Sequence, residues 1–182
     1  MIVLVAGVSG SGKSTIGSLL AGQLGWVFED GDALHPAANI AKMHAGVPLT
    51  DEDRRPWLLA VGQWMDQQLA AAGSGVIACS ALKRSYRDQL RHGRPALRMV
   101  FLRVGRETLA ARLAARHGHF FRPELLDSQL ADAGIPLPSE PCLVVEAGRP
   151  ASAVVREIVS RLGLAAYGGA SQGSEPRDEA EA

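Results

Sequence analysis

The stretch Gly7-Val8-Ser9-Gly10-Ser11-Gly12-Lys13-Ser14 decides the fold, because it fits the pattern G-x-x-x-x-G-K-[ST] at every position. The continuous apolar run Ile2 to Ala6 precedes it, as expected of a buried parallel strand. Apolar residues then recur at helical spacing: Ile16, Leu19, Leu20 and Leu24. A strand, a glycine-rich turn and a helix in this order are the context in which the pattern binds phosphate.

Elementary chemistry gives this loop its expected role. Glycines allow the backbone to curl so that successive N–H groups point at phosphate oxygens, and the following helix adds the positive end of its dipole. Lys13 is expected to reach the outer phosphates and the Ser14 hydroxyl to ligate Mg²⁺. A chance glycine-rich turn is the alternative, and both flanking elements disfavour it. The predicted nucleotide-binding residues of the loop are Gly7, Val8, Ser9, Gly10, Ser11, Gly12, Lys13, Ser14 and Thr15.

Further apolar runs alternate with helical patterns along the chain. The strand-like runs cover residues 26–28, 76–79, 97–102 and 142–145. This alternation predicts an α/β fold, a parallel sheet with helices on both faces, whose ligands bind beyond the carboxyl ends of the strands. Polar residues gather at those ends: Asp30 and Asp32 after the second strand, Ser80 and Lys83 after the third.

Length and composition limit the possible classes. The chain has 182 residues, which suits one domain, and 19 basic against 19 acidic side chains, which gives no charge footprint for nucleic acid or an anionic membrane. No apolar run approaches the roughly 20 residues that span a bilayer, so we expect a cytoplasmic protein. We expect residues 1–164 to form the domain. Residues 165–182, rich in Gly, Ser, Glu and Ala, are expected to form a disordered tail.

The phosphate-binding loop alone indicates nucleotide binding and not catalysis. The chain has no Asn-Lys-x-Asp box that would read guanine, and it is too short for an added transport or motor module. The third strand ends at Cys79-Ser80 and offers no carboxylate for a metal, so Asp30-Gly31-Asp32 is the candidate source. These features favour a small-metabolite kinase.

Three blocks of sequence resemble the P-loop gluconokinases. The first contains Asp30-Gly31-Asp32-Ala33-Leu34-His35-Pro36 and continues to Asp53-Arg54 and Pro56-Trp57-Leu58. The second is Cys79-Ser80-Ala81-Leu82-Lys83 with Tyr86-Arg87-Asp88. The third is Gly118-His119-Phe120-Phe121 with Ser128-Gln129. The resemblance covers about residues 3–162. It departs at Leu130-Ala131-Asp132, where the family has an aromatic and then an acidic residue, which leaves contacts beyond that point open.

The resemblance implies a nucleoside-monophosphate-kinase-like fold with a five-stranded parallel sheet and a mobile lid at about residues 116–135. It also implies a homodimer that uses ATP and Mg²⁺ to phosphorylate D-gluconate to 6-phospho-D-gluconate. Shikimate kinase or a nucleotide kinase is the first rival, although Ser80-Ala81-Leu82 stands where shikimate kinases carry a Gly-Gly-Gly run. A nucleotide-binding module without transferase activity is the second.

The acceptor side offers several candidates. Asp32 is expected to orient the substrate hydroxyl and accept its proton, and Asp30 to hold a metal-bound water; the alternative is an acidic loop that merely caps a helix. His35 either hydrogen-bonds the polyol, fixes the loop or lies on the surface. Arg54 is the leading clamp for a carboxylate, with an ion pair to Asp51 or Asp53 as the alternative or companion.

Basic residues supply the remaining candidates. Ser80 and Lys83 are predicted to begin a helix whose N-terminus binds an anionic group of the substrate. Arg87 is a further substrate-binding candidate, although the stripe formed with its basic neighbours is typical of a solvated helix face. Arg112 and Arg116 lie four apart on a predicted helix that leads into the lid implied by the resemblance. Both are expected to bind the nucleotide, and Arg116 also to act in catalysis, unless both are ordinary surface arginines.

Lys13→Ala tests the phosphate-binding loop. We expect kcat to collapse while the fold stays intact, because the change removes charge stabilisation at the phosphates and no core contact. Steady-state kinetics and circular dichroism check the two halves of this expectation. Unchanged turnover would remove the loop from the mechanism.

Overall fold

Five parallel strands form one sheet in the order β2-β3-β1-β4-β5. The computed structural model of the chain describes residues 1–115, 130 and 134–165. The strands are β1 (Ile2–Ala6), β2 (Val27–Asp30), β3 (Gly75–Ala78), β4 (Leu97–Arg103) and β5 (Cys142–Glu146). The predicted parallel α/β fold is confirmed.

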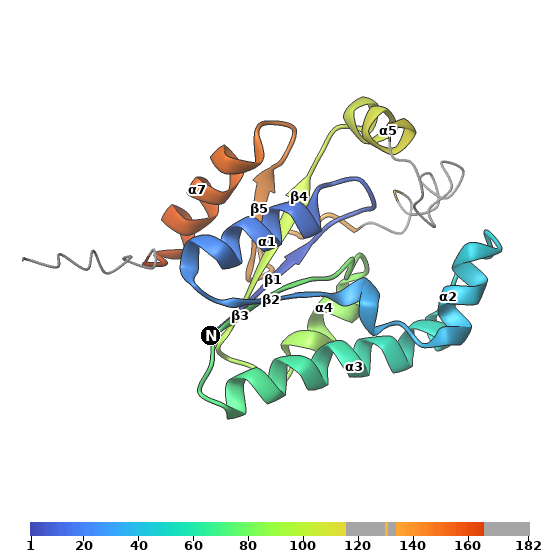
Figure 1. Ribbon diagram of the computed structural model, residues 1–182, viewed down its shortest axis with the longest axis horizontal. Coiled ribbons are helices and arrows are strands. Elements are labelled where there is room, and N and C mark those ends of the chain that lie inside the picture. The colour runs from blue at the N-terminus through green and yellow to red at the C-terminus, as the bar shows by residue number, and fades with distance from the viewer. Residues whose placement is uncertain (116–129, 131–133, 166–182) are drawn as a thin grey trace, which may run out of the picture.

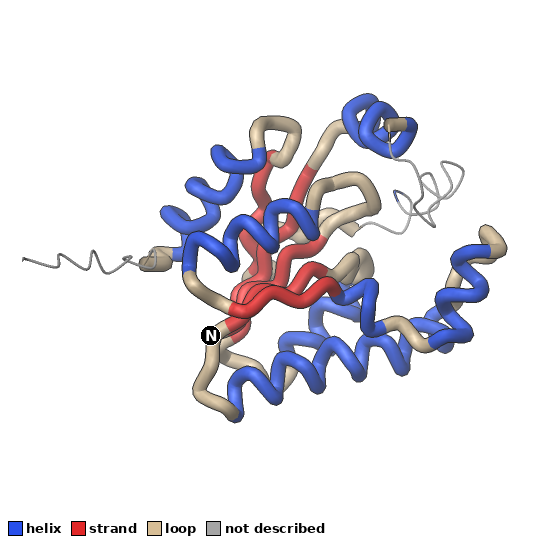
Figure 2. The backbone as a smooth tube through the Cα atoms, viewed as in Figure 1, coloured by secondary structure: helices blue, strands red, loops and turns tan. Residues whose placement is uncertain are grey.

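Helices cover both faces of this sheet (Figures 1 and 2). The helices α1 (Lys13–Leu24) and α7 (Ala151–Leu162) pack on one face. The helices α3 (Asp51–Ala70), α4 (Arg84–Arg91) and α5 (Arg106–Ala114) contribute buried residues to the other. A short 3-10 helix, η1 (Gly31–Leu34), and α2 (Ala37–His44) connect β2 to α3.

The central strand explains the apolar run at the start of the sequence. Every residue of β1 is fully buried, because strands flank it on both sides and helices cover both faces. Such burial stabilises the fold by about 25 cal/mol for each Å² of apolar surface that is removed from water. Cys79 is also buried and Cys142 partly so, and neither forms a disulfide. Burial raises the pKa of the Cys79 thiol to about 12, which keeps it unreactive.

The start of α3 is fixed by a reciprocal cap. The Thr50 hydroxyl accepts from the Asp53 N–H at 3.2 Å, and the Asp53 carboxylate accepts from the Thr50 N–H at 2.9 Å. This capping box fixes the helix start at Thr50. The helix then buries Trp57 against the sheet, so the Arg54 turn has a fixed position beside the strand ends.

The register of the strands creates the site. Asp30 at the end of β2 is paired with Ala78 of β3, and Ala78 with Val5 of β1. The three strands therefore end level, and the phosphate-binding loop, the acidic pair and the loop after β3 meet at one edge of the sheet.

Two predicted features lie mostly outside the described residues. Of the expected lid, residues 116–129 and 131–133 are not described, and this includes Arg116. Residues 166–182 of the expected tail are not described either. The proposed domain boundary stays a prediction. None of the helices in the described ranges combines the length and apolar character that crossing a bilayer requires.

Gly31→Ala tests the close packing between the acidic pair and the sheet. A Cβ on Gly31 would lie 2.5 Å from the backbone oxygen of Ala78. Relieving this clash should cost about 1–3 kcal/mol of unfolding free energy and displace Asp30 and Asp32. Gly22→Ala is the control, since nothing lies within 4 Å of its Cβ position and alanine favours the helix. Urea unfolding should show a loss only for Gly31→Ala, and equal stabilities would contradict the packing argument.

Candidate active site

The loop between β1 and α1 curls as the sequence predicted. Gly7, Gly10 and Gly12 have φ values of 146°, 78° and 94°, which L side chains rarely adopt. The Ser11 N–H donates to the Val8 carbonyl at 3.2 Å, and Lys13 Nζ donates to the same carbonyl oxygen at 3.2 Å. The lysine ammonium therefore lies against the phosphate-binding loop, beside the space that a phosphate chain would occupy.

The two predicted metal-side residues lie in direct contact. Ser14 Oγ donates to Asp30 Oδ2 at 2.6 Å, although the two residues are 16 positions apart in the chain. The other Asp30 oxygen accepts from the Asp32 N–H at 3.1 Å, so this carboxylate also caps η1. A hydroxyl and a carboxylate are the oxygen ligands that Mg²⁺ prefers. The donor set fits that ion. The described residues contain no group of three or more His, Cys, Asp or Glu side chains that would hold a metal by themselves.

Asp32 and His35 lie on the turn that follows β2, and Trp57 anchors this turn. Trp57 Nε1 donates to the Gly31 carbonyl at 2.7 Å, and its ring stacks on His35 with centroids 4.4 Å apart and planes 9° apart. Burial lowers the pKa of His35; the Asp32 charge opposes this shift and the Arg54 charge adds to it. The three candidate acceptor residues therefore lie within electrostatic reach of one another.

Arg54 and Lys83 come together around Tyr86. Lys83 Nζ donates to Asp51 at 2.6 Å, and Arg54 lies 3.9 Å from the same carboxylate. The two cationic groups lie 5.6 and 6.0 Å from the Tyr86 ring centroid, and the Tyr86 hydroxyl bonds Asp51 at 2.5 Å. The hydrogen bond from Lys83, then that from Tyr86, lowers the pKa of Asp51. Of the two ion pairs expected for Arg54, the one with Asp51 is present.

Lys42 forms an ion pair with Asp53, the other carboxylate expected near Arg54. Its Nζ bonds both Asp53 oxygens, at 2.6 and 2.8 Å, and these bonds tie α2 to the start of α3. Sequence reasoning found neither this pair nor the role of Tyr86, which was visible only as a member of the second family block.

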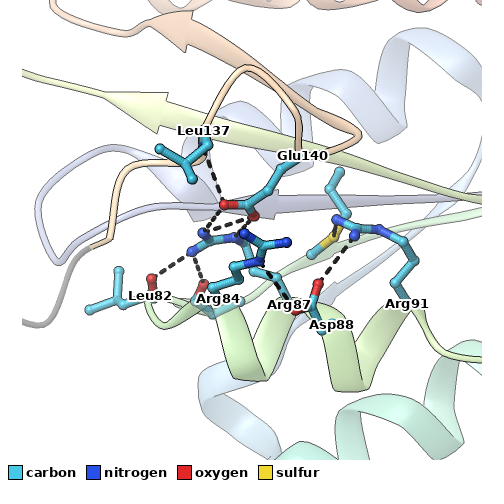
Figure 3. A network of polar contacts seen from close by, with 9 residues as sticks. Leu82, Arg84, Arg87, Asp88, Arg91, Leu137 and Glu140 are labelled. Carbon is cyan, nitrogen blue, oxygen red and sulfur yellow. Dashed lines mark hydrogen bonds and ion pairs between the residues drawn. The ribbon is translucent and has the colours of Figure 1, made fainter.

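Arg87 is not on a solvated helix face, so the expectation for the basic stripe is wrong at this position. Its side chain is 1% exposed and its guanidinium grips Glu140, 2% exposed, through two bonds of 3.0 Å (Figure 3). The same group donates to the carbonyls of Ala81 and Leu82 at 3.3 and 2.6 Å. Glu140 also accepts from the Leu137 N–H. Arg87 thus holds the loop after β3 against the segment before β5.

The helix after β3 begins later than the sequence suggested. It starts at Arg84, with Lys83 as its N-cap residue, so Ser80 lies four positions before the helix. The Ser80 carbonyl accepts from the Gly7 N–H at 3.4 Å, which places this residue beside the phosphate-binding loop. Ser80 and Lys83 therefore belong to one loop at the acceptor side, and only Lys83 marks the helix start.

Arg112 lies against the far side of the phosphate-binding loop. Its guanidinium is 3.5 and 3.4 Å from the carbonyls of Gly10 and Ser11 and bonds the Ala147 carbonyl at 2.9 Å. These residues line a hollow of about 370 Å³ together with Thr15 and Arg149. The hollow adjoins the phosphate-binding loop. Ala147 and Arg149 were not foreseen, because nothing in the sequence after β5 signals a ligand.

The fold and this site define the class of protein. The sequence model of the shikimate kinase family matches residues 9–162. With the phosphate-binding loop at the end of β1 and an acidic turn at the end of β2, the chain is a P-loop kinase of small molecules.

Two similar proteins specify the family. A gluconokinase from Gluconobacter oxydans (strain 621H) is 45% identical over 157 residues, which cover 86% of this chain and 88% of that protein. The crystal structure of a gluconokinase from Sinorhizobium meliloti 1021 is 45% identical and has a TM-score of 0.78, covering 88% of this chain and 90% of that one. The chain therefore belongs to the family that the shikimate kinase model describes and, within it, to the gluconokinases.

A shikimate kinase structure provides the contrast. The enzyme from Aquifex aeolicus vf5 is 19% identical with a TM-score of 0.58, covering 90% of this chain and 96% of that one. At this identity the likeness concerns the fold alone.

The Arg87–Glu140 pair gives a prediction of stability. Arg87→Met leaves the Glu140 carboxylate buried without its partner, which should cost about 3–5 kcal/mol of unfolding free energy. Hydrogen bonds from Arg87 hold the pKa of Glu140 below its ordinary 4.5. The stabilisation is therefore present above that value and is lost as the pH falls through the lowered pKa.

Urea unfolding of Glu140→Gln at several pH values checks this sign. The variant should be less stable than the parent at neutral pH, and its stability should fall less steeply between about pH 5 and pH 3. Parallel pH profiles for the two proteins would show that Glu140 does not carry the charge of a buried pair.

Proposed function

We propose that this chain transfers the γ-phosphoryl group of ATP to D-gluconate and gives 6-phospho-D-gluconate. One observation carries the proposal: a phosphate-binding loop, an acidic turn, a cation from α3 and a cation from the loop before α4 meet at one edge of the sheet. An acceptor with many hydroxyls and one carboxylate matches this combination. The identity to gluconokinases over most of the chain supports the same substrate.

The nucleotide side is built mainly from backbone atoms. The N–H groups of the curled loop and Lys13 bind the phosphates of ATP. Arg112, beside the hollow next to the loop, binds the nucleotide further out. Ser14 would hold Mg²⁺ directly and Asp30 through a water molecule, and the ion would neutralise charge on the phosphates. Arg116 stays a predicted catalytic and nucleotide-binding residue, since it lies outside the described residues.

The acceptor side is built from side chains. Asp32 orients the attacking hydroxyl and accepts its proton, and His35 hydrogen-bonds the polyol. Arg54 and Lys83 bind the carboxylate, because two cations beside one acidic residue leave the cluster with a net positive charge. Ser80 lies on the same loop as Lys83. We leave Arg87 out of the substrate-binding residues, because its buried guanidinium already bonds Glu140 and two backbone carbonyls.

Two further expectations belong to the same proposal. Assembly as a homodimer and a cytoplasmic location follow from the family resemblance and composition, and both stay predictions. Shikimate is the second candidate acceptor, favoured by the match of the shikimate kinase model to residues 9–162. It also carries hydroxyls and one carboxylate, so only turnover separates the two.

An acceptor panel tests the proposal. ADP release should depend on gluconate, and shikimate and nucleoside monophosphates should leave it at background. Asp32→Asn should lower kcat with gluconate by about a hundredfold or more and leave ATP binding intact, because the amide cannot accept the proton. If ADP were released only with shikimate, shikimate and not gluconate would be the acceptor. If none of the acceptors caused ADP release, the chain would be a nucleotide-binding protein without this activity.

A further inference from the structure

Asn39 is a buried polar residue on α2 to which the proposed reaction assigns no role. It is 3% exposed, and its side-chain nitrogen lies 2.7 Å from the Asp53 carbonyl oxygen and 3.3 Å from His35 Nδ1. One amide group therefore contacts both the first turn of α3 and a residue of the acceptor side.

The contact with Asp53 fixes the orientation of the amide. A backbone carbonyl oxygen only accepts hydrogen bonds, so the Asn39 atom that faces it must be the NH₂ group. That group also faces His35 Nδ1, which must then be the unprotonated acceptor nitrogen. In a neutral imidazole the proton consequently lies on Nε2.

The plane of the His35 ring is fixed as well. Its stacking partner Trp57 is 1% exposed and is itself anchored to the Gly31 carbonyl. With one face against Trp57 and Nδ1 held by Asn39, the ring has little freedom to flip. The Nε2–H bond therefore has a defined direction.

Burial, more than the surrounding charges, favours the neutral ring. Asp32 on η1 raises the pKa of His35, and Arg54 on α3 lowers it together with burial, the largest effect. Asp53 of α3 and Lys42 of α2 pair with each other nearby. Protonation would place an N–H at Nδ1 against the Asn39 NH₂ group, a contact between two donors.

We propose that Asn39 is a positioning residue that holds His35 as the Nε2–H tautomer, so that this bond donates to an oxygen of the sugar-acid acceptor. This inference rests on the proposed function for the identity of the acceptor. The tautomer itself rests only on the contacts of Asn39, so the two parts can be tested apart.

Ring nitrogen NMR of the unaltered protein tests the tautomer. Protonated and unprotonated imidazole nitrogens resonate far apart, and the His35 signals can be assigned as those missing from His35→Gln. At neutral pH we expect an unprotonated Nδ1 and a protonated Nε2. A proton on Nδ1 would overturn the proposal, whatever the substrate of the enzyme.

Two variants of Asn39 test the cause. Asn39→Ala should let both tautomers appear, because no donor faces Nδ1. Asn39→Asp should raise the pKa of His35 above that of the unaltered protein, because a carboxylate accepts from Nδ1–H and stabilises the charged ring. NMR titration of His35 measures both effects. A His35 with the same tautomer and titration in all three proteins would contradict the assignment.

Kinetics with gluconate and ATP test the consequence for the acceptor. Asn39→Ala should raise the KM for gluconate roughly five- to tenfold, the loss of one oriented hydrogen bond, and leave the KM for ATP unchanged. Lys42→Met is the matched control, since it removes the other α2–α3 bond without touching His35. An equal rise of the KM for gluconate in both variants would mean that Asn39 acts only by joining α2 to α3. If the protein did not use gluconate, the NMR result would stand and the proposed substrate would fail.

Discussion

The level ends of β2, β3 and β1 are the constraint on which the site depends. Parallel pairing of Asp30 with Ala78 and of Ala78 with Val5 leaves each strand to end at the same height. The hydroxyl of Ser14, at the start of α1, can then reach the Asp30 carboxylate, although β3 lies between β2 and the strand β1 that leads into the phosphate-binding loop. A slip of one residue in β2 would turn its side chains to the opposite face and separate the acidic turn from the phosphate-binding loop.

The two halves of the proposed site are built by different means. The nucleotide half uses a curled backbone, so its form depends on glycines and on the burial of β1. The acceptor half uses side chains from η1, α3 and the loop before α4, each held by a partner such as Trp57, Tyr86 or Asp51. Relatives on this fold can therefore keep the first half and change the second, which agrees with a shikimate kinase of only 19% identity having the same architecture.

Local patterns in the sequence predicted the elements well, since strands, helix caps and the phosphate-binding loop depend on neighbouring residues. The contact between Ser14 and Asp30 agrees with the expectation that both residues lie on the metal side of the site. The burial of Arg87 was missed because its partner lies 53 positions away, in a segment with no recognisable pattern. The role of Asn39 was missed for a similar reason. It depends on two partners that only the folded chain brings together, the His35 ring and the Asp53 carbonyl of α3.

The grip of Arg87 on Glu140 sets an order of events during synthesis of the protein. Chains fold as they leave the ribosome, with the N-terminal part available first. The loop after β3 receives two of its backbone contacts from Arg87, and Arg87 is neutralised only when Glu140 has emerged. The acceptor side of the molecule is thus completed late, and a nascent chain that stops before residue 140 carries an arginine that has no buried counter-charge to join.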